Sequence, residues 1–172
     1  MESEREGDFA RRTWYVLHVK PRTEKKTDGF LAGLGVFHYV PLLRKVTKVQ
    51  RRKVVRYLPA FPGYVFTRLL PDERIAVLKT RQIVRTIEVP RPREMIRQLR
   101  QVRRAGRAPV DLRVAESFEQ GELVRVVSGP LRGVEGRVVR RGAAMTLVLS
   151  VDILGRALEA SVDPSDVEHA HP

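Results

Sequence analysis

Cysteine is absent from this 172-residue chain, which excludes a disulfide framework, a thiolate metal site and a cysteine nucleophile. Long apolar runs are also missing. No stretch of about 18 apolar residues is present, so we expect no membrane-spanning helix and no membrane partner. Residues 1–12 are charged and lack the apolar segment of a secretory signal. Together these absences favour a cytoplasmic protein.

The residue types that support catalysis are sparse as well. Of the four histidines, His18 and His38 fall in separate predicted strands and His169 and His171 in the tail, and no cluster of His, Asp and Glu has ligand spacing. The glycine-rich segment 129–136 lacks the Lys-Ser/Thr pair of a phosphate-binding loop. No serine occupies a nucleophile-elbow sequence. We therefore expect no enzyme, no metal site and no cofactor.

Acidic residues are scarce in the first part of the chain. Residues 1–110 contain 26 Lys and Arg against 10 Asp and Glu, whereas residues 111–172 contain 7 against 10. The net charge of +13 therefore divides into +16 and −3. Because arginine and lysine neutralise phosphates, the first part predicts contact with a polyanion, most simply nucleic acid. Solubility alone is the alternative explanation. The acidic second part is better suited to a protein partner.

Strand and helix patterns alternate over residues 13–105. Aromatic and β-branched runs predict strands, and apolar residues spaced three or four apart predict helices. Strands are predicted at residues 14–19, 36–42, 64–70 and 83–89, helices at 23–34, 71–78 and 92–104, and a basic hairpin or loop at 44–57. In the second helix we expect Ile75 and Leu78 to face inward and Asp72 to cap the start. This order predicts an α+β fold, in which a mixed sheet is flanked by helices.

After this region the sequence contains only short strand patterns separated by turns. Valine-rich runs and fixed glycines over residues 121–141 are typical of a small, tightly bent barrel. We therefore predict an all-β, SH3-like barrel. The expected domains are a flexible tail (1–12), an N-terminal domain (13–105), a linker (106–118) and a C-terminal domain (119–172).

Several short segments, in order, match a known family. Trp14-Tyr15-Val16 opens the first domain and Phe61-Pro62-Gly63-Tyr64-Val65-Phe66 stands midway. Residues 121–131 and 151–156 follow in the second domain. With this order and spacing, residues 13–168 resemble the NusG family of transcription elongation factors. Residues 121–141 resemble the KOW motif that this family carries.

The resemblance implies a binding factor without chemistry of its own. Members of the family bridge the cleft of RNA polymerase, between the clamp helices and the gate loop. Tyr64 and Phe66 match the apolar patch for the clamp helices, although aromatic residues on a strand are often core. Thr80 and Arg81 fall where the family approaches the gate loop, and an arginine there is also a stabilising partner for a helix C-terminus.

Two groups of cations are candidates for binding nucleic acid. Lys20, Arg22 and Lys25 match the region that the family places near non-template DNA. Arg51, Arg52 and Lys53 lie in a run of seven cations without an acid between residues 44 and 56, for which we expect upstream DNA or nascent RNA. Contacts there should be with phosphates and independent of sequence. An ordinary solvated surface is the alternative for both groups.

The C-terminal domain is expected to recruit a protein, and the protein is expected to be a monomer. The resemblance implies ribosomal protein S10 or Rho as partner, with Leu131, Ile153, Leu154 and Arg156 as contacts. Leu131 and Leu154 stand where general members carry aromatic residues on which Rho binding depends. The compact stretch between residues 36 and 61 is more like the specialised, RfaH-like antiterminators. A ribosome-associated, RNA-binding KOW protein is the alternative function.

Overall fold

A computed structural model describes residues 11–49, 52–115, 121–141 and 144–170 of the chain. The chain divides into two compact units. Unit 1 comprises Met1–Val40 and Phe61–Pro92, and unit 2 comprises Pro41–Ala60 and Arg93–Pro172. No helix in the described ranges has the length and apolar content needed to span a bilayer.

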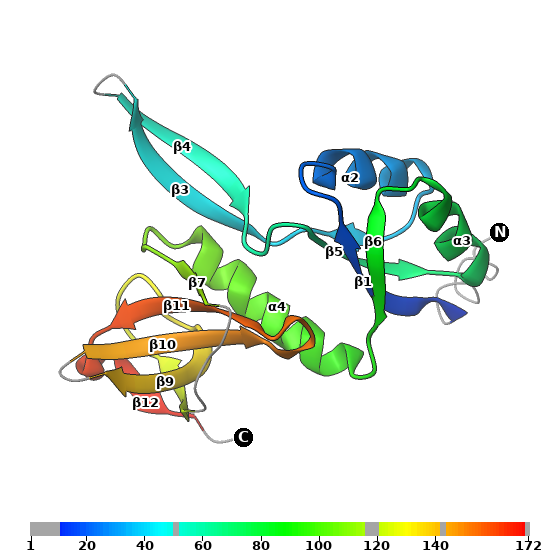
Figure 1. Ribbon diagram of the computed structural model, residues 1–172. Helices are drawn as coiled ribbons and strands as arrows, with labels where there is room; N and C mark the ends of the chain where they lie inside the picture. The colour runs from blue at the N-terminus through cyan, green and yellow to red at the C-terminus, as the bar shows by residue number, and fades with distance from the viewer. Residues whose placement is uncertain (1–10, 50–51, 116–120, 142–143, 171–172) are drawn as a thin grey trace. The chain divides into compact units, whose positions relative to one another are not determined.

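The sheet of unit 1 contains four strands in the order β2 (His38–Tyr39), β5 (Tyr64–Leu69), β1 (Thr13–Val19) and β6 (Ile83–Glu88) (Figure 1). Val16 of β1 lies opposite Phe66 on one side and Ile87 on the other. Every pairing is antiparallel, so the prediction of a mixed sheet is wrong in this respect. The reason is topological: β5 and β6 run in the same direction, but β1 separates them.

Helices α2 (Glu24–Gly33) and α3 (Pro71–Lys79) pack on one face of this sheet. Leu31 and Val77, one from each helix, join strand residues in a single buried cluster; its strand members are Leu17, Val19, Val65 and Leu69. The predicted inward positions Ile75 and Leu78 are instead 51% and 42% exposed. Val77 is the buried residue of α3, because the short helix packs through a single narrow stripe.

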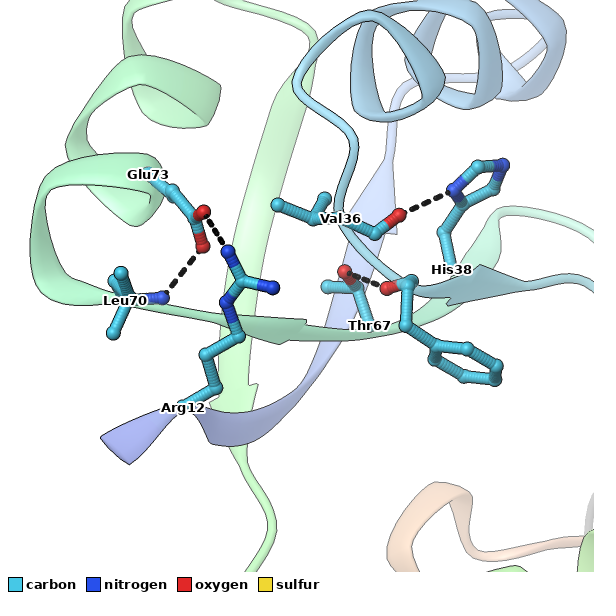
Figure 2. Close-up of polar contacts among 7 residues, drawn as sticks. Arg12, Val36, His38, Thr67, Leu70 and Glu73 are labelled. Atoms are coloured by element: carbon cyan, nitrogen blue, oxygen red, sulfur yellow. Dashed lines mark hydrogen bonds and ion pairs between the residues drawn. The ribbon is translucent and has the colours of Figure 1, made fainter. Parts of the chain in front are cut away.

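The start of α3 differs from the prediction as well. Leu70 is the N-cap residue, so Asp72 lies inside the first turn rather than at the cap. The Glu73 carboxylate accepts a hydrogen bond from the Leu70 backbone N–H at 2.8 Å and another from the Arg12 guanidinium at 2.5 Å (Figure 2). Glu73 thus satisfies a free N–H at the helix start and ties the residue before β1 to α3.

In unit 2, β3 (Leu42–Val49) and β4 (Arg52–Pro59) form an antiparallel hairpin with Val46 opposite Val55 (Figure 1). The C-terminal sheet is antiparallel and has the order β12 (Val167–His169), β8 (Glu122–Val126), β9 (Glu135–Arg141), β10 (Ala144–Val151), β11 (Arg156–Val162) and β7 (Arg113–Ala115). Two 3-10 turns, η1 (Asp152–Leu154) and η2 (Pro164–Asp166), complete it. The region is all-β as predicted, whereas its closure into an SH3-like barrel stays a prediction.

Helix α4 (Pro92–Arg107) belongs almost wholly to unit 2. Gln98, Gln101 and Arg104 each form hydrogen bonds with the C-terminal sheet or its turns. In this division the hairpin and α4 group with the C-terminal strands, and the expected domain boundaries stay a prediction. The expected linker, 106–118, is also partly regular: α4 continues to Arg107, and Arg113–Ala115 pairs with β11. Most of the expected tail lies outside the described residues.

Candidate functional site

Three connections meet at one end of the unit 1 sheet. We call them the three-loop surface: residues 20–23 between β1 and α2, residues 61–64 that lead into β5 and include its first residue, and residues 80–82 between α3 and β6. Backbone hydrogen bonds hold them together, from Lys20 N to Gln82 O at 2.8 Å and from Val19 N to Gly63 O at 2.8 Å. Six of the predicted contact residues lie on this surface or beside it: Lys20, Arg22, Lys25, Tyr64, Thr80 and Arg81.

Residues 20–23 form a tight turn. The backbone N–H and the hydroxyl of Thr23 both donate to the Lys20 carbonyl, at 3.1 and 2.7 Å. Arg22 adopts a left-handed conformation with φ of 65°. Non-glycine residues rarely adopt it, and strain of this kind concentrates at functional sites. Lys20 and Arg22 are both exposed.

Residues 80–82 contain a second left-handed arginine, Arg81, with φ of 57°. The Thr80 hydroxyl donates to the Val77 carbonyl at 2.7 Å and accepts from the Gln82 N–H at 3.3 Å. The Thr27 hydroxyl donates to the Gln82 side-chain oxygen at 3.2 Å, so Gln82 is bound to α2 as well as to Lys20. This network fixes the exposed Arg81 relative to the start of α2.

The turn 61–64 brings in Tyr64. Gly63 has φ of 81°, a conformation that side chains rarely adopt, and its N–H donates to the Glu24 carboxylate at 3.2 Å. The Tyr64 ring stacks on His18, with centroids 4.8 Å apart, and stays partly exposed. Phe66, the other predicted patch residue, is 0% exposed and lies in the interior of the structure. Of the two aromatics, only Tyr64 presents surface to a partner here.

The chemistry of this surface is that of binding. Exposed cations surround it, namely Lys20, Arg22, Lys25, Lys26, Lys79 and Arg81. The carboxylate of Glu24, the acid nearest the turn, accepts a hydrogen bond from the Gly63 N–H. Among the residues that the structure describes, no group of three His, Asp or Glu side chains is placed to hold a metal ion. The arrangement suits a phosphate-bearing or acidic partner.

The hairpin forms a separate cationic surface in unit 2. Arg52 and Lys53 are exposed, whereas Arg51 lies outside the described residues. Within the hairpin, Lys45 Nζ of β3 donates to the Asp111 carboxylate at 2.9 Å and to the Leu112 carbonyl at 3.2 Å. The hydrogen bond from Lys45, and then its charge, hold the pKa of Asp111 below its usual value.

The predicted partner contacts of the C-terminal domain are divided by burial. Leu131 is 4% exposed, so its side chain belongs to the interior. Ile153, Leu154 and Arg156 are partly exposed at the tip between β10 and β11. Gln98 of α4 holds this tip in both directions: its amide donates to the Asp152 carboxylate at 2.6 Å and accepts from the Asp152 N–H at 3.1 Å.

Three polar residues that organise these sites were not predicted from the sequence. Gln82 connects its loop to helix α2, Glu24 holds the turn before β5, and Gln98 holds the tip. No local pattern singles them out, because their partners are 39 to 55 residues away along the chain. The only feature of the sequence that could have indicated these residues is that each is an isolated polar residue beside a predicted loop or on a helix face.

Comparison with known proteins gives two findings. The family model described as "Transcription termination factor nusG" matches residues 12–104, more than half of the chain and close to the expected domain 13–105. The chain is also 26% identical over 180 aligned positions to the "Transcription termination/antitermination protein NusG" of Borreliella burgdorferi (strain ATCC 35210 / DSM 4680 / CIP 102532 / B31). That alignment covers 91% of this chain and 98% of the relative.

Proposed function

Because the chain belongs to the NusG family of transcription termination and antitermination factors, we propose that it binds RNA polymerase through the three-loop surface. In this proposal Tyr64 contacts the clamp helices, while Thr80 and Arg81 approach the gate loop. The protein then bridges the two sides of the cleft and reduces pausing and termination.

The observation that carries this proposal is the joining of the three loops. Residues assigned to two polymerase contacts and to DNA are far apart in the sequence, yet the Lys20–Gln82 and Val19–Gly63 hydrogen bonds bring their loops together. A single rigid surface is what a bridging protein needs, because a flexible one would lose affinity on being ordered. Lys20, Arg22 and Lys25 extend this surface with positive charge and are proposed to contact phosphates of non-template DNA.

The proposed mechanism is a shift in population. Polymerase with a closed clamp elongates, and a ligand that binds the closed form more tightly than the open form favours it by that difference in affinity. No group of the protein needs to donate a proton or attack a bond. Arg52 and Lys53 of the hairpin are proposed to contact upstream DNA or nascent RNA through phosphates.

The C-terminal sheet is proposed to recruit a second protein through its tip. Ile153 and Leu154 offer apolar contacts and Arg156 a charge, whereas the buried Leu131 supports the tip from inside. Ribosomal protein S10 and Rho are the candidate partners. The leucine at position 154, in place of an aromatic residue, favours S10 over Rho.

The polymerase contact is tested with Tyr64→Ala and binding to core polymerase free of nucleic acid. We expect about thirtyfold weaker binding, because a tyrosine at the centre of an interface commonly contributes about 2 kcal/mol. Tyr57→Ala is the matched control: it removes the same side chain from the hairpin, where Tyr57 is 62% exposed. Equal affinities for the two variants would contradict the assignment of Tyr64.

The functional consequence is measured by transcription on purified polymerase, with and without Rho. The unsubstituted protein should reduce pausing and termination, and Tyr64→Ala should lose this effect. Pull-down of the protein with polymerase or with ribosomal subunits separates the proposal from the ribosomal alternative. Capture of ribosomal subunits without polymerase would overturn it.

A further inference from the structure

Helix α4 carries six arginines and no lysine, and Glu94 is its only acid. All six arginine side chains are exposed, at positions 93, 97, 100, 103, 104 and 107. Each of them lies three or four residues from another arginine, a spacing that brings like charges together on a helix surface and destabilises the helix. The stability of the helix therefore does not explain why α4 contains six arginines, and another role has to account for them.

The other faces of α4 are already occupied. Met95, Leu99 and Val102 form its buried stripe. Gln98 and Gln101 face the C-terminal sheet, through hydrogen bonds to Asp152 and to the Glu135 N–H. Arg104, on the flank, donates to the Gly133 carbonyl at 2.8 Å. These contacts fix the rotation of the helix about its axis.

Arg97 lines a groove against the C-terminal sheet, beside Gln98 and Gln101. With the rotation fixed, four arginines remain on the outward face: Arg93, Arg100, Arg103 and Arg107. Arg93, Arg100 and Arg107 are seven residues apart, which is nearly two turns, so they point in almost the same direction. They span about 21 Å of helix, over which duplex DNA carries about 12 phosphates. We call the row formed by Arg93, Arg100 and Arg107 the arginine line.

We propose that the arginine line of α4 is a further nucleic-acid contact, which binds the phosphodiester backbone without reading sequence. Arginine suits this role because its planar fork donates two hydrogen bonds to one phosphate. A membrane surface is the wrong partner, since the apolar stripe of α4 is buried rather than free to insert.

The surroundings within unit 2 support the same partner. Gly106 packs directly on β3: a Cβ built there would lie 2.6 Å from the Leu42 carbonyl oxygen. The end of α4 therefore adjoins the base of the hairpin, and residues 42–59 contain seven cations and no acid. A polyanion on α4 meets further positive charge there. This proposal does not rest on polymerase binding or on the three-loop surface, which belongs to unit 1.

The test is the salt dependence of binding to a labelled DNA duplex and to a labelled single-stranded RNA. The variant is Arg93→Gln/Arg100→Gln/Arg107→Gln, in which glutamine preserves helix propensity. The matched control, Arg113→Gln/Arg132→Gln/Arg140→Gln, removes the same charge from exposed arginines of the C-terminal sheet and its turns. Circular dichroism verifies that both variants are folded.

For the α4 variant we expect at least tenfold weaker binding to one of the two probes. The slope of log K against log salt should fall by about 0.9 for each lost contact on the duplex, or about 0.7 on the single strand. The control should keep the slope of the unsubstituted protein. The probe that responds identifies the ligand as duplex or single strand. Equal losses in variant and control, or no loss in either, would overturn the proposal.

A conservative variant guards against a merely structural effect. Arg93→Lys/Arg100→Lys/Arg107→Lys keeps the charge and loses the fork, so it should retain the salt slope and bind more weakly than the unsubstituted protein. A lysine variant that lost the slope as the glutamine variant does would contradict charge neutralisation by this row. All measurements use nucleic acid alone, so a failure of the polymerase proposal leaves the result interpretable.

Discussion

Two glycines within helices have opposite surroundings. A Cβ built on Gly106 of α4 would lie 2.6 Å from the Leu42 carbonyl oxygen and 3.2 Å from Leu43 Cδ2. A Cβ built on Gly29 of α2 would meet no atom within 4 Å. Because the obstacle at Gly106 is backbone rather than the end of a flexible side chain, the helix can approach β3 this closely only without a side chain.

The same substitution should therefore have opposite effects at the two sites. Gly106→Ala should lower the free energy of unfolding by about 1–3 kcal/mol, the usual cost of overpacking, even though alanine gains about 1 kcal/mol over glycine inside a helix. Gly29→Ala should gain up to about 1 kcal/mol, because only the helix preference acts there. Urea denaturation followed by circular dichroism measures both. Stabilisation at both sites would show that α4 does not pack on Leu42.

At the scale of elements, one ion pair ties the segment after α4 to strand β3. Lys45 Nζ contacts Asp111 at 2.9 Å, and this contact lowers the pKa of the Asp111 carboxyl from 3.8. A lowered pKa in the folded state means that the unfolded state binds more protons between the two pKa values. The contribution of Asp111 to stability is therefore complete above pH 3.8 and is lost as the pH falls through the lowered folded-state value.

We expect Asp111→Asn to lose this part of the acid dependence. The difference from the unsubstituted protein should be small, because both side chains are partly exposed to solvent and salt screens such pairs. Urea midpoints measured from pH 2 to 6, at low and high salt, test it. A difference between the two proteins that grew toward low pH would have the wrong sign.

Most helices and strands were predictable because their sequence patterns are local. The strands at 14–19, 64–70 and 83–89 and the helix at 92–104 agree with β1, β5, β6 and α4 to within three residues at each end. The predicted strand 36–42 is confirmed only in its middle: His38–Tyr39 pairs with β5, whereas Leu42 already belongs to the hairpin.

The candidate sites were less predictable, because burial depends on tertiary contacts. The local sequence around Phe66 and around Leu131 is compatible with either an exposed or a buried side chain. In the folded protein both side chains are buried. The cations of the three-loop surface were identified individually. Their common location follows from Gln82, whose partners are remote in sequence.

At the scale of the whole molecule, Gln98 joins the part of the chain that matches the NusG model to the sheet beyond it. Gln98 lies within residues 12–104, whereas Asp152 lies outside them. The paired hydrogen bonds between these residues hold the tip that we propose as the partner contact. The tip is thus held by a helix from the first part of the chain.

Gln98→Ala should loosen the tip. We expect faster hydrogen exchange at residues 152–155 and weaker binding of the partner protein, because a loosened tip has to be ordered on binding. Gln101→Ala is the comparison, since its side chain bonds the Glu135 N–H and should affect β9 instead. Exchange at residues 152–155 that did not change in Gln98→Ala would show that these bonds do not restrain the tip.

The hairpin has one further consequence. Strands β3 and β4 form a two-stranded sheet, and neither pairs with another described strand, so each has an outer edge of unpaired backbone groups. Such an edge is a template with which a strand from a second copy of the chain can pair. Val46 and Val55, each more than two-fifths exposed, would strengthen this pairing. Mutual repulsion among the hairpin cations opposes it. These charges therefore also keep the protein dispersed, and neutralising them would promote self-association.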